Sequence, residues 1–265
     1  MILTLLQAAT VTTGRVAGVE FAVVGSGGPV TLFAHGLGGS YAETRPLAMR
    51  VTGTRVLLTF RGHGDSAALP GGWDYDLLAS DLLAVADHLG ATACVGLSLG
   101  AGTLLRVLRE TPTRFDRLGF VLPAALDATR SDGATAQLTA LGAAINRGDV
   151  GAVTGFLLAD LPADVRARRG VALLMKRRAE ALVRRPAPVP RSADRPLAHR
   201  SQLRSVTAPA LVIGQQDDPL HPLDLAGELA DALPDARLLA LPAAGVFWTA
   251  GRLAQNALAE HLETP

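Results

Sequence analysis

The chain has 265 residues, of which 49% are hydrophobic, and its 25 basic residues nearly balance its 24 acidic ones. This length allows one large core, and the apolar content excludes a disordered chain. A net charge of +1 argues against nucleic acid or an anionic membrane as the main partner. The lone cysteine, Cys94, lies in an apolar run and cannot form an internal disulfide, so we expect a cytoplasmic protein.

Short apolar runs alternate with helical patterns in both the first and the last part of the chain. The runs predicted as strands cover residues 19–25, 30–35, 55–60, 92–97, 117–123, 209–214 and 237–242. Apolar residues at helical spacing predict helices over 74–90 and 98–111, a helix from Pro222, and a last helix at the end. Strands that alternate with helices build a mostly parallel, doubly wound α/β sheet.

The pattern changes between residues 124 and 205, where Ala and Arg are frequent and no convincing strand occurs. Helical spacing recurs there until a proline-rich segment, which cannot continue a helix. We therefore predict a helical cap, residues 124–205, inserted into an α/β core of residues 1–123 and 206–265. The arginines of the cap are interpreted as a solvated face rather than as a nucleic-acid patch.

The segment GLSLG, residues 96–100, matches the pattern G-x-S-x-G between a predicted strand and a predicted helix. A sharp strand-to-helix turn needs glycine on both sides of the serine, and it holds the hydroxyl above the end of the sheet. Ser98 is interpreted as a nucleophile at the positive end of a helix, and an ordinary turn serine is the alternative. The segment HGLGGS, residues 35–40, follows another strand, and its backbone N–H groups are candidates for binding an oxyanion.

Four motifs, HGLGGS, RGHGDS, GLSLG and GQQDDPLHP, occur here in the order and at the spacing of the α/β-hydrolase superfamily. The chain resembles the capped members of that superfamily, which act on small molecules. The resemblance covers about residues 16–122 and 206–262, and it implies an α/β-hydrolase sheet with a variable cap.

The same resemblance implies roles for individual residues. Ser98 corresponds to the nucleophile of the family, and the N–H groups of Leu37 and Leu99 correspond to its oxyanion hole. His35 and Gly36 are expected beside the pocket. His63, in RGHGDS, is interpreted as structural.

The acid of such a triad is expected in GQQDDPLHP, which offers Asp217 and Asp218. Asp218 is favoured, because it stands four positions before Pro222, which also fixes the start of the next helix. Two aspartates that serve only as turn formers are the alternative.

The chain order of this fold is Ser, Asp, His, and the histidine is expected after the last strand, in LPAAGVFWT. Val246 occupies that position, and valine cannot accept a proton. Val246, Phe247 and Trp248 would form an apolar wall of the pocket in place of the imidazole. Ordinary core packing is the alternative for these three residues.

A serine hydroxyl is a weak nucleophile without a base, and removal of the histidine from a working triad costs about a million-fold in turnover. His221 is a candidate base, because only three positions separate it from Asp218. The interpretation that we favour for His221 is nevertheless a residue that merely flanks the start of a helix. The other histidines expected within reach are His35, His63 and His199.

These residues favour an enzyme that acts on a small apolar ester, lactone or thioester with a non-standard or incomplete triad. The alternatives are a non-hydrolytic enzyme, cyclase-like or lyase-like, that uses the oxyanion hole, and a receptor-like protein that binds a ligand without turnover. We expect no cofactor and no metal, because the histidines are scattered and no C-x-x-C pair occurs. No apolar run reaches about 18 residues, so we expect no membrane partner.

Overall fold

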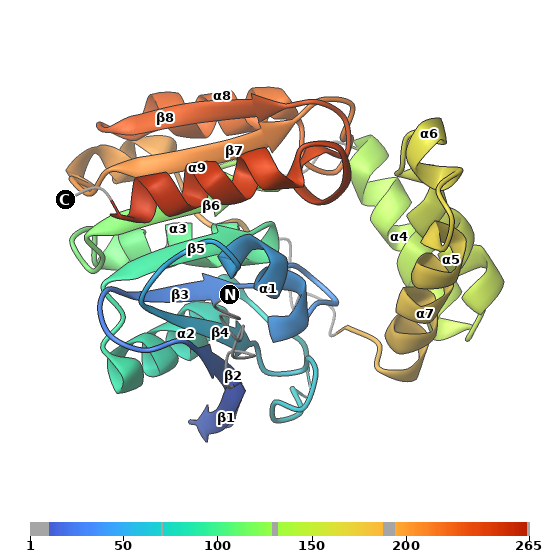
Figure 1. The fold of residues 1–265 in the computed structure, drawn as a ribbon, viewed down its shortest axis with the longest axis horizontal. Helices are drawn as coiled ribbons and strands as arrows, with labels where there is room; N and C mark the ends of the chain where they lie inside the picture. The colour runs from blue at the N-terminus through green and yellow to red at the C-terminus, as the bar shows by residue number, and fades with distance from the viewer. Residues whose placement is uncertain (1–10, 70, 129–131, 188–193, 264–265) are drawn as a thin grey trace, which may run out of the picture.

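The computed structural model describes residues 11–69, 71–128, 132–187 and 194–263, and one mixed sheet of eight strands forms its centre (Figure 1). The strands are β1 (Val11–Val16), β2 (Val19–Val24), β3 (Val30–Ala34), β4 (Thr54–Thr59), β5 (Ala93–Leu97), β6 (Arg117–Val121), β7 (Ala210–Gln215) and β8 (Ala236–Leu241). They lie in the order β1-β2-β4-β3-β5-β6-β7-β8. β2 is antiparallel to both of its neighbours, and all pairs from β4 to β8 are parallel. The predicted, mostly parallel sheet is confirmed.

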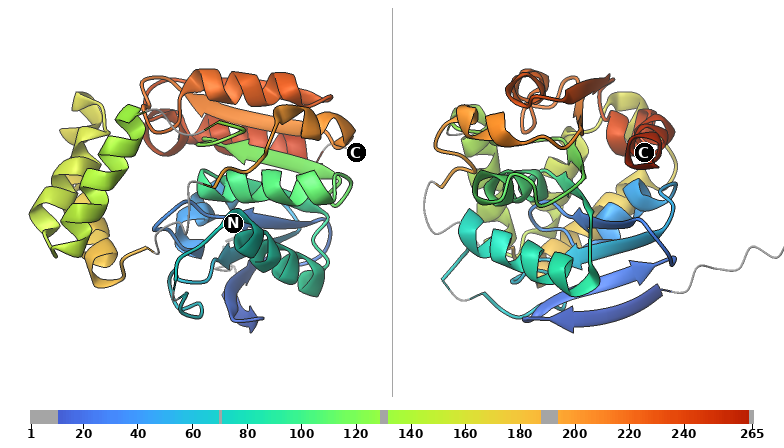
Figure 2. Two further views of the ribbon diagram at one scale, coloured as in Figure 1. Left: turned by 180° about the vertical axis from the view of Figure 1, so that it is seen from behind. Right: turned by 90° about the vertical axis from the view of Figure 1, so that its left-hand side faces the viewer.

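Helices cover both faces of the sheet, as Figures 1 and 2 show. α1 (Tyr41–Ala48) and α9 (Gly251–Glu263) lie on one face; α2 (Tyr75–Leu89), α3 (Leu99–Glu110) and α8 (Leu223–Ala232) lie on the other. Successive side chains of a strand point to opposite faces. Leu32 of β3 accordingly enters the core under α2 and α3, whereas its neighbour Phe33 enters the core under α1 and α9. The sheet is therefore buried on both sides, which explains the continuous apolar runs of its strands.

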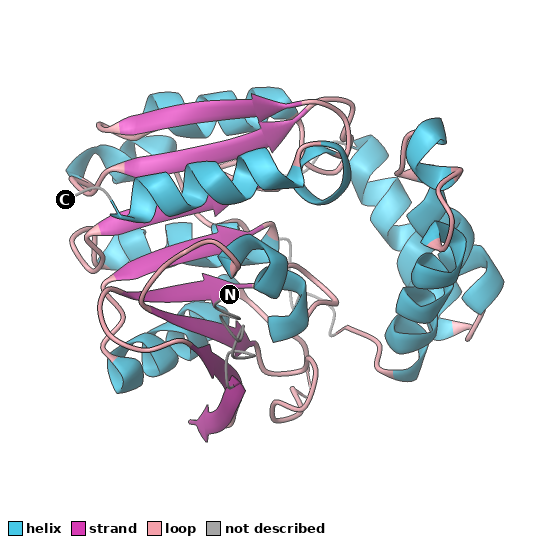
Figure 3. Ribbon diagram, viewed as in Figure 1, coloured by secondary structure: helices cyan, strands magenta, loops and turns pink. Residues whose placement is uncertain are grey.

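Four further helices stand beyond the carboxyl end of the parallel strands (Figure 3). They are α4 (Asp132–Asn146), α5 (Val150–Ala159), α6 (Ala163–Arg166) and α7 (Val171–Arg184). Ala144, Val153 and Ala179 form the small core that joins three of them. Leu197 and Leu203, the latter in the 3₁₀ helix η1 (Arg200–Ser205), instead belong to the core of the α/β body. The exact division at residues 124 and 205 stays a prediction, and the last part of that stretch packs on the body.

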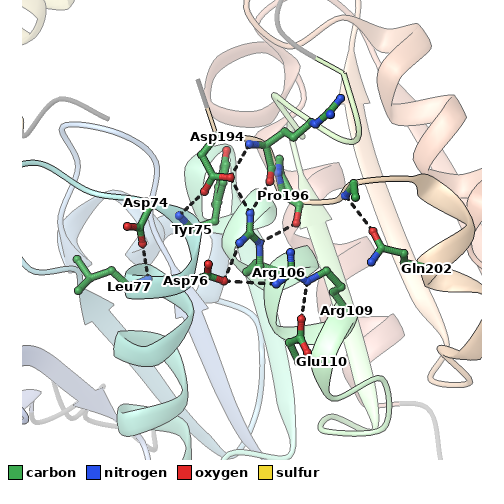
Figure 4. A network of polar contacts seen from close by, with 12 residues as sticks. Asp74, Tyr75, Asp76, Leu77, Arg106, Arg109, Glu110, Asp194, Pro196 and Gln202 are labelled. Carbon is green, nitrogen blue, oxygen red and sulfur yellow. Dashed lines mark hydrogen bonds and ion pairs between the residues drawn. The ribbon is translucent and has the colours of Figure 1, made fainter. Parts of the chain in front are cut away.

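Arg106 of α3 binds the segment that returns from the cap to the body (Figure 4). Its side chain is only 5% exposed. The guanidinium donates to the carbonyl of Pro196 at 2.8 Å and pairs with Asp194 at 2.8 Å and with Asp76 of α2 at 2.6 Å. A guanidinium carries five donors in a planar fork, so one residue can satisfy partners on both α2 and the return segment. The return segment is thereby fixed against α3, the helix that follows Ser98.

The sequence analysis did not predict β1 or α1. β1 is an edge strand whose residues are mostly exposed, so it lacks the apolar alternation by which strands are recognised. α1 has only eight residues and contains Pro46, which is unfavourable inside a helix. A single π-helical turn, η2 (Gly245–Thr249), follows β8. In the part of the chain that the structure describes, no helix has both the length and the apolar content needed to cross a membrane.

Candidate active site

Ser98 lies on the turn between β5 and α3, where its backbone has φ 51° and ψ −105°. Such a conformation costs a non-glycine residue about 1–3 kcal/mol and persists only where the surroundings enforce it. A Cβ atom on Gly96 would lie 2.4 Å from the carbonyl oxygen of Gly100, and a Cβ on Gly100 would lie 2.3 Å from that of Ala34. Both glycines are therefore needed for α3 to pack against the sheet. This packing holds Ser98, half-buried, at the start of the helix.

A continuous chain of hydrogen bonds starts from the Ser98 hydroxyl. Oγ of Ser98 lies 2.9 Å from Nε2 of His221, and Nδ1 of the same ring lies 2.9 Å from Oδ2 of Asp218. An ionised carboxylate only accepts hydrogen bonds, so Nδ1 carries the hydrogen and the lone pair of Nε2 faces the serine hydroxyl. The structure thus brings together three of the residues that the sequence selected, in the order hydroxyl, imidazole, carboxylate.

The loop between β7 and α8 carries both Asp218 and His221. Oδ1 of Asp218 accepts the N–H groups of Leu220 and His221, each at 3.0 Å, and these bonds fold the loop around the carboxylate. Pro222 then caps the start of α8. Asp217, the alternative acid, is exposed and occupies a left-handed turn position with φ 54°. Of the two aspartates, only Asp218 contacts the imidazole.

Gln215, the last residue of β7, is a site residue that the sequence analysis missed. Its Nε2 donates to Oδ2 of Asp218 at 2.8 Å, and its Oε1 accepts the N–H of Val246 at 3.3 Å. Burial acts to raise the pKa of Asp218, but the hydrogen bonds and charge of His221 and the hydrogen bond from Gln215 outweigh it, and the pKa lies below its ordinary value. Asp218 is therefore ionised at neutral pH. The signal that could have identified Gln215 from the sequence is its amide side chain at the end of the strand that precedes the acid.

Val246 stands where the resemblance expects a histidine. It lies in η2 and is 2% exposed, and it packs in the core beneath α9 together with Leu241 and Leu258. Phe247 is 40% exposed and Trp248 is partly buried. The structure therefore favours core packing for Val246 over the predicted apolar wall. The wall of Phe247 and Trp248 stays a prediction.

His35 is the first residue of HGLGGS and has no exposed surface. Its Nε2 accepts the N–H of Phe60 at 3.0 Å, so its Nδ1 carries the hydrogen and donates to the carbonyl of Gly36 at 2.6 Å. Burial lowers the pKa of His35 to about 4, against the opposing effect of the Gly36 hydrogen bond. A buried, neutral ring with both nitrogens engaged neither lines a pocket nor accepts a proton from Ser98. The predicted pocket position of His35 is therefore wrong.

The loop itself passes close to the nucleophile. A Cβ atom on the buried Gly36 would lie 3.4 Å from the Cβ of Ser98. Several N–H groups around this point are engaged: Gly36 donates to Glu43 at 3.0 Å, and Gly100 donates to the carbonyl of His35 at 3.1 Å. For the N–H groups of Leu37 and Leu99, in contrast, the described residues offer no acceptor. These two donors are available to a bound molecule.

The two other candidate histidines have structural contacts. His63 is 4% exposed, its ring centroid lies 5.0 Å from that of His35, and its Nδ1 lies 3.3 Å from the carbonyl oxygen of Arg61. Burial and the neighbouring His35 lower the pKa of His63 to about 4. His199 is exposed, and its side chain caps η1 by accepting the N–H of Ser201 at 3.2 Å. Among the candidates, His221 is the histidine that contacts Ser98.

An acidic side chain of the cap, Asp160, lies in the surroundings of the site. Asp160, at the end of α5, accepts a hydrogen bond from Gln137 of α4 at 2.8 Å. Burial raises the pKa of Asp160, the hydrogen bond from Gln137 opposes this, and the charge of Asp218 raises it further. The end of α5 thus lies within electrostatic range of the loop that carries Asp218 and His221.

Residues 31–254 match the sequence model of the alpha/beta hydrolase family, and no curated protein sequence matches the chain. Similar solved structures include a thermophilic esterase from Thermogutta terrifontis (18% identity, TM-score 0.72, 97% of this chain and 100% of that chain). Naproxen esterase from Bacillus subtilis is another (16% identity, TM-score 0.75, 95% of this chain and 91% of that chain). A third is an alpha/beta hydrolase from Sphaerobacter thermophilus (25% identity, TM-score 0.64, 87% of this chain and 92% of that chain). Because the two esterases share only 18% and 16% of their residues with this chain, their likeness to it shows a shared fold and no more.

Proposed function

Because the chain belongs to the alpha/beta hydrolase family, we propose that it is a serine hydrolase in which Ser98 is the nucleophile, His221 the base and Asp218 the acid. The observation that supports this proposal best is the unbroken hydrogen-bond chain from Asp218 through His221 to Ser98, with two contacts of 2.9 Å. The order Ser, Asp, His along the chain is kept. The histidine, however, stands three positions after the acid on the same loop, instead of after β8.

In the first half of the reaction, Oγ of Ser98 attacks the carbonyl carbon of an ester while Nε2 of His221 takes the hydroxyl proton. Asp218 stabilises the imidazolium through Nδ1–H, and the N–H groups of Leu37 and Leu99 stabilise the negative charge on the former carbonyl oxygen. The tetrahedral intermediate then expels the alcohol, which receives the proton from His221. An acyl group remains on Ser98.

In the second half, His221 takes a proton from a water molecule, whose oxygen attacks the acyl carbon. The second tetrahedral intermediate collapses, Oγ of Ser98 leaves and regains the proton, and the carboxylic acid is released. Each proton moves over a single contact, between His221 and Ser98 or between His221 and the bound molecule. A ring held by Asp218 on one side and facing Ser98 on the other meets this need.

The substrate class that we propose is a small, mainly apolar ester, lactone or thioester. The cap helices α4–α7 beyond the carboxyl end of the sheet support a small substrate, because ligands of open α/β sheets bind at that end. Two of the similar solved structures described above are esterases by name. Asp160 on the cap disfavours an anionic acyl group, since its carboxylate lies within electrostatic range of the triad loop. The cytoplasmic location stays a prediction.

Hydrolysis of p-nitrophenyl butyrate tests the proposal. We expect measurable turnover in the wild type, loss of at least about a thousand-fold in Ser98→Ala and His221→Ala, and no loss in His199→Ala, the matched histidine control. Turnover that survives Ser98→Ala would instead favour a reaction that uses only the oxyanion hole. Binding of the ester without any turnover would favour the receptor-like alternative.

A further inference from the structure

One face of the cap helix α7 lies against the loops that surround the nucleophile. Arg178, Leu182 and Arg185, the last at the end of the helix, are spaced four and three positions apart and so share a face. Arg178 pairs with Glu43 at 2.6 Å, and Arg185 donates to the carbonyl of Gly64, in the RGHGDS loop, at 2.6 Å. Between them, Leu182 packs on the oxyanion loop: a Cβ on Gly38 would lie 2.7 Å from its Cδ2. The cap therefore rests directly on the loop that carries Leu37.

The carboxylate of Glu43 fills the inside of that loop. Its side chain is 13% exposed, and its Oε2 accepts the N–H of Gly36 at 3.0 Å. A Cβ atom on Gly39 would lie 2.2 Å from the same Oε2. Glycine at position 39 thus leaves the space that the carboxylate occupies. Through its other oxygen, Oε1, Glu43 is held by Arg178 of the cap.

The contacts of Gly36 determine the direction of the Leu37 N–H group. The carbonyl of Gly36 accepts the N–H of Gly39 at 3.0 Å and the Nδ1–H of His35 at 2.6 Å. That carbonyl and the N–H of Leu37 belong to one planar trans peptide, so they point in opposite directions. Glu43 fixes the peptide before Gly36, and His35 fixes the peptide after it. The two planes meet at the Cα of Gly36, so a shift of this atom moves the oxyanion donor.

Charge gives Arg178 a second effect. An unpaired carboxylate so close to the oxyanion loop would repel the negative charge that develops on the substrate oxygen. The guanidinium of Arg178 offsets this charge without displacing the Gly36 hydrogen bond, because each partner uses a different carboxylate oxygen.

We propose that Glu43 is a positioning residue for the oxyanion donor of Leu37, and that Arg178 couples the seating of the cap to that donor. The inference rests on the proposed function, in which Leu37 N–H stabilises the tetrahedral intermediate. The oxyanion hole is fully formed only while α7 is docked on the loop.

The test compares Arg178→Gln with Arg178→Lys and with Arg177→Gln, which removes a neighbouring exposed arginine of α7 as the matched control. With p-nitrophenyl butyrate we expect Arg178→Gln to lower kcat about tenfold, a fraction of the 10²–10³ lost with a whole oxyanion donor. KM should stay within about twofold, Arg178→Lys should recover most of kcat, and Arg177→Gln should match the wild type. An aliphatic trifluoromethyl ketone, which forms an oxyanion with the serine, should bind Arg178→Gln about tenfold more weakly.

A double-mutant cycle makes the test specific. Glu43→Gln keeps an acceptor for Gly36 N–H but removes the charge, so adding Arg178→Gln to it should change kcat less than about twofold. Equal kcat in Arg178→Gln and the wild type, or the same tenfold loss in the Glu43→Gln background, would overturn the inference.

Hydrogen exchange separates this inference from the proposed function. If the wild type fails to hydrolyse the ester, the proposed function fails, but α7 must still hold the loop. Exchange of the amides of residues 36–39 should then be faster in Arg178→Gln than in Arg177→Gln. Identical exchange in the two variants would overturn the inference by itself.

Discussion

Two buried histidines, His35 in the oxyanion loop and His63 in the RGHGDS loop, are expected to make the fold sensitive to acid. His35 has no exposed surface and His63 is 4% exposed, and burial lowers the pKa of each from 6.5 to about 4. Between these values both rings are neutral in the folded protein, whereas they are protonated in the unfolded chain. The unfolded chain therefore binds more protons, and the free energy of unfolding falls as the pH drops from 6.5 towards 4.

The size of this effect follows from the two pKa values. One pKa unit corresponds to about 1.36 kcal/mol, so a lowering of about 2.5 units makes each histidine cost about 3 kcal/mol at pH 4. The charge of His35 contributes to the lowered pKa of His63, so the two costs are not independent. The pair should lower the free energy of unfolding by about 3–6 kcal/mol, against a typical total of about 5–15 kcal/mol.

Urea unfolding followed by circular dichroism at pH 7 and pH 4.5 measures this fall directly. His63→Asn keeps a donor in the place of Nδ1 for the carbonyl of Arg61 but does not titrate, and His88→Asn removes an exposed histidine as the matched control. From pH 7 to pH 4.5, the free energy of unfolding should fall by about 2 kcal/mol less in His63→Asn than in the wild type or the control. Equal falls in all three proteins would refute the reasoning.

Four further substitutions test other parts of the structure. Gln215→Leu removes a hydrogen bond to the charged Asp218, worth about 1.5–3 kcal/mol, so kcat for p-nitrophenyl butyrate should fall at least about tenfold; an unchanged kcat would show that Gln215 does not hold the acid. Arg106→Met leaves the carbonyl of Pro196 and the carboxylate of Asp194 without this donor, and the free energy of unfolding measured in urea should fall by about 1.5–3 kcal/mol; a loss under about 1 kcal/mol would contradict the role of this residue. Gly100→Ala places a Cβ 2.3 Å from a backbone oxygen and should cost more than about 3 kcal/mol. Gly227→Ala, which meets open space in α8, should instead raise the free energy of unfolding by about 0.5–1 kcal/mol; similar losses in both glycine variants would refute the account of the turn.

The sheet and the serine turn could be predicted because their signals are local. A strand buried on both faces is a continuous apolar run, and the close approach of α3 to β3 leaves glycine as the residue that fits at position 100. β1 and α1 gave no such signal, since the first is exposed and the second contains Pro46. Local patterns thus identify elements with a continuous or periodic apolar signal, and they miss an exposed edge strand and a short helix interrupted by proline.

The catalytic assignment of His221 could not be decided from spacing. Three positions place His221 within reach of Asp218, but a residue that flanks a helix start has the same spacing. The direction of the ring depends on the fold of the loop. Two backbone N–H groups donate to Oδ1 of Asp218, and these bonds turn the loop back on itself. Gln215 and Glu43 were missed for a related reason. Each also contacts a partner far along the chain, which spacing does not reveal: Val246 for the first and Arg178 for the second.

Labelling of Ser98 tests the central claim, that His221 activates this serine, most directly. The wild type, Ser98→Ala and His221→Gln would be treated with a small alkyl fluorophosphonate, and the rate of adduct formation would be followed by intact mass. The account predicts one adduct in the wild type, none in Ser98→Ala, and a rate at least about a thousand-fold lower in His221→Gln. Labelling of His221→Gln at the wild-type rate, or no labelling of the folded wild type, would contradict it.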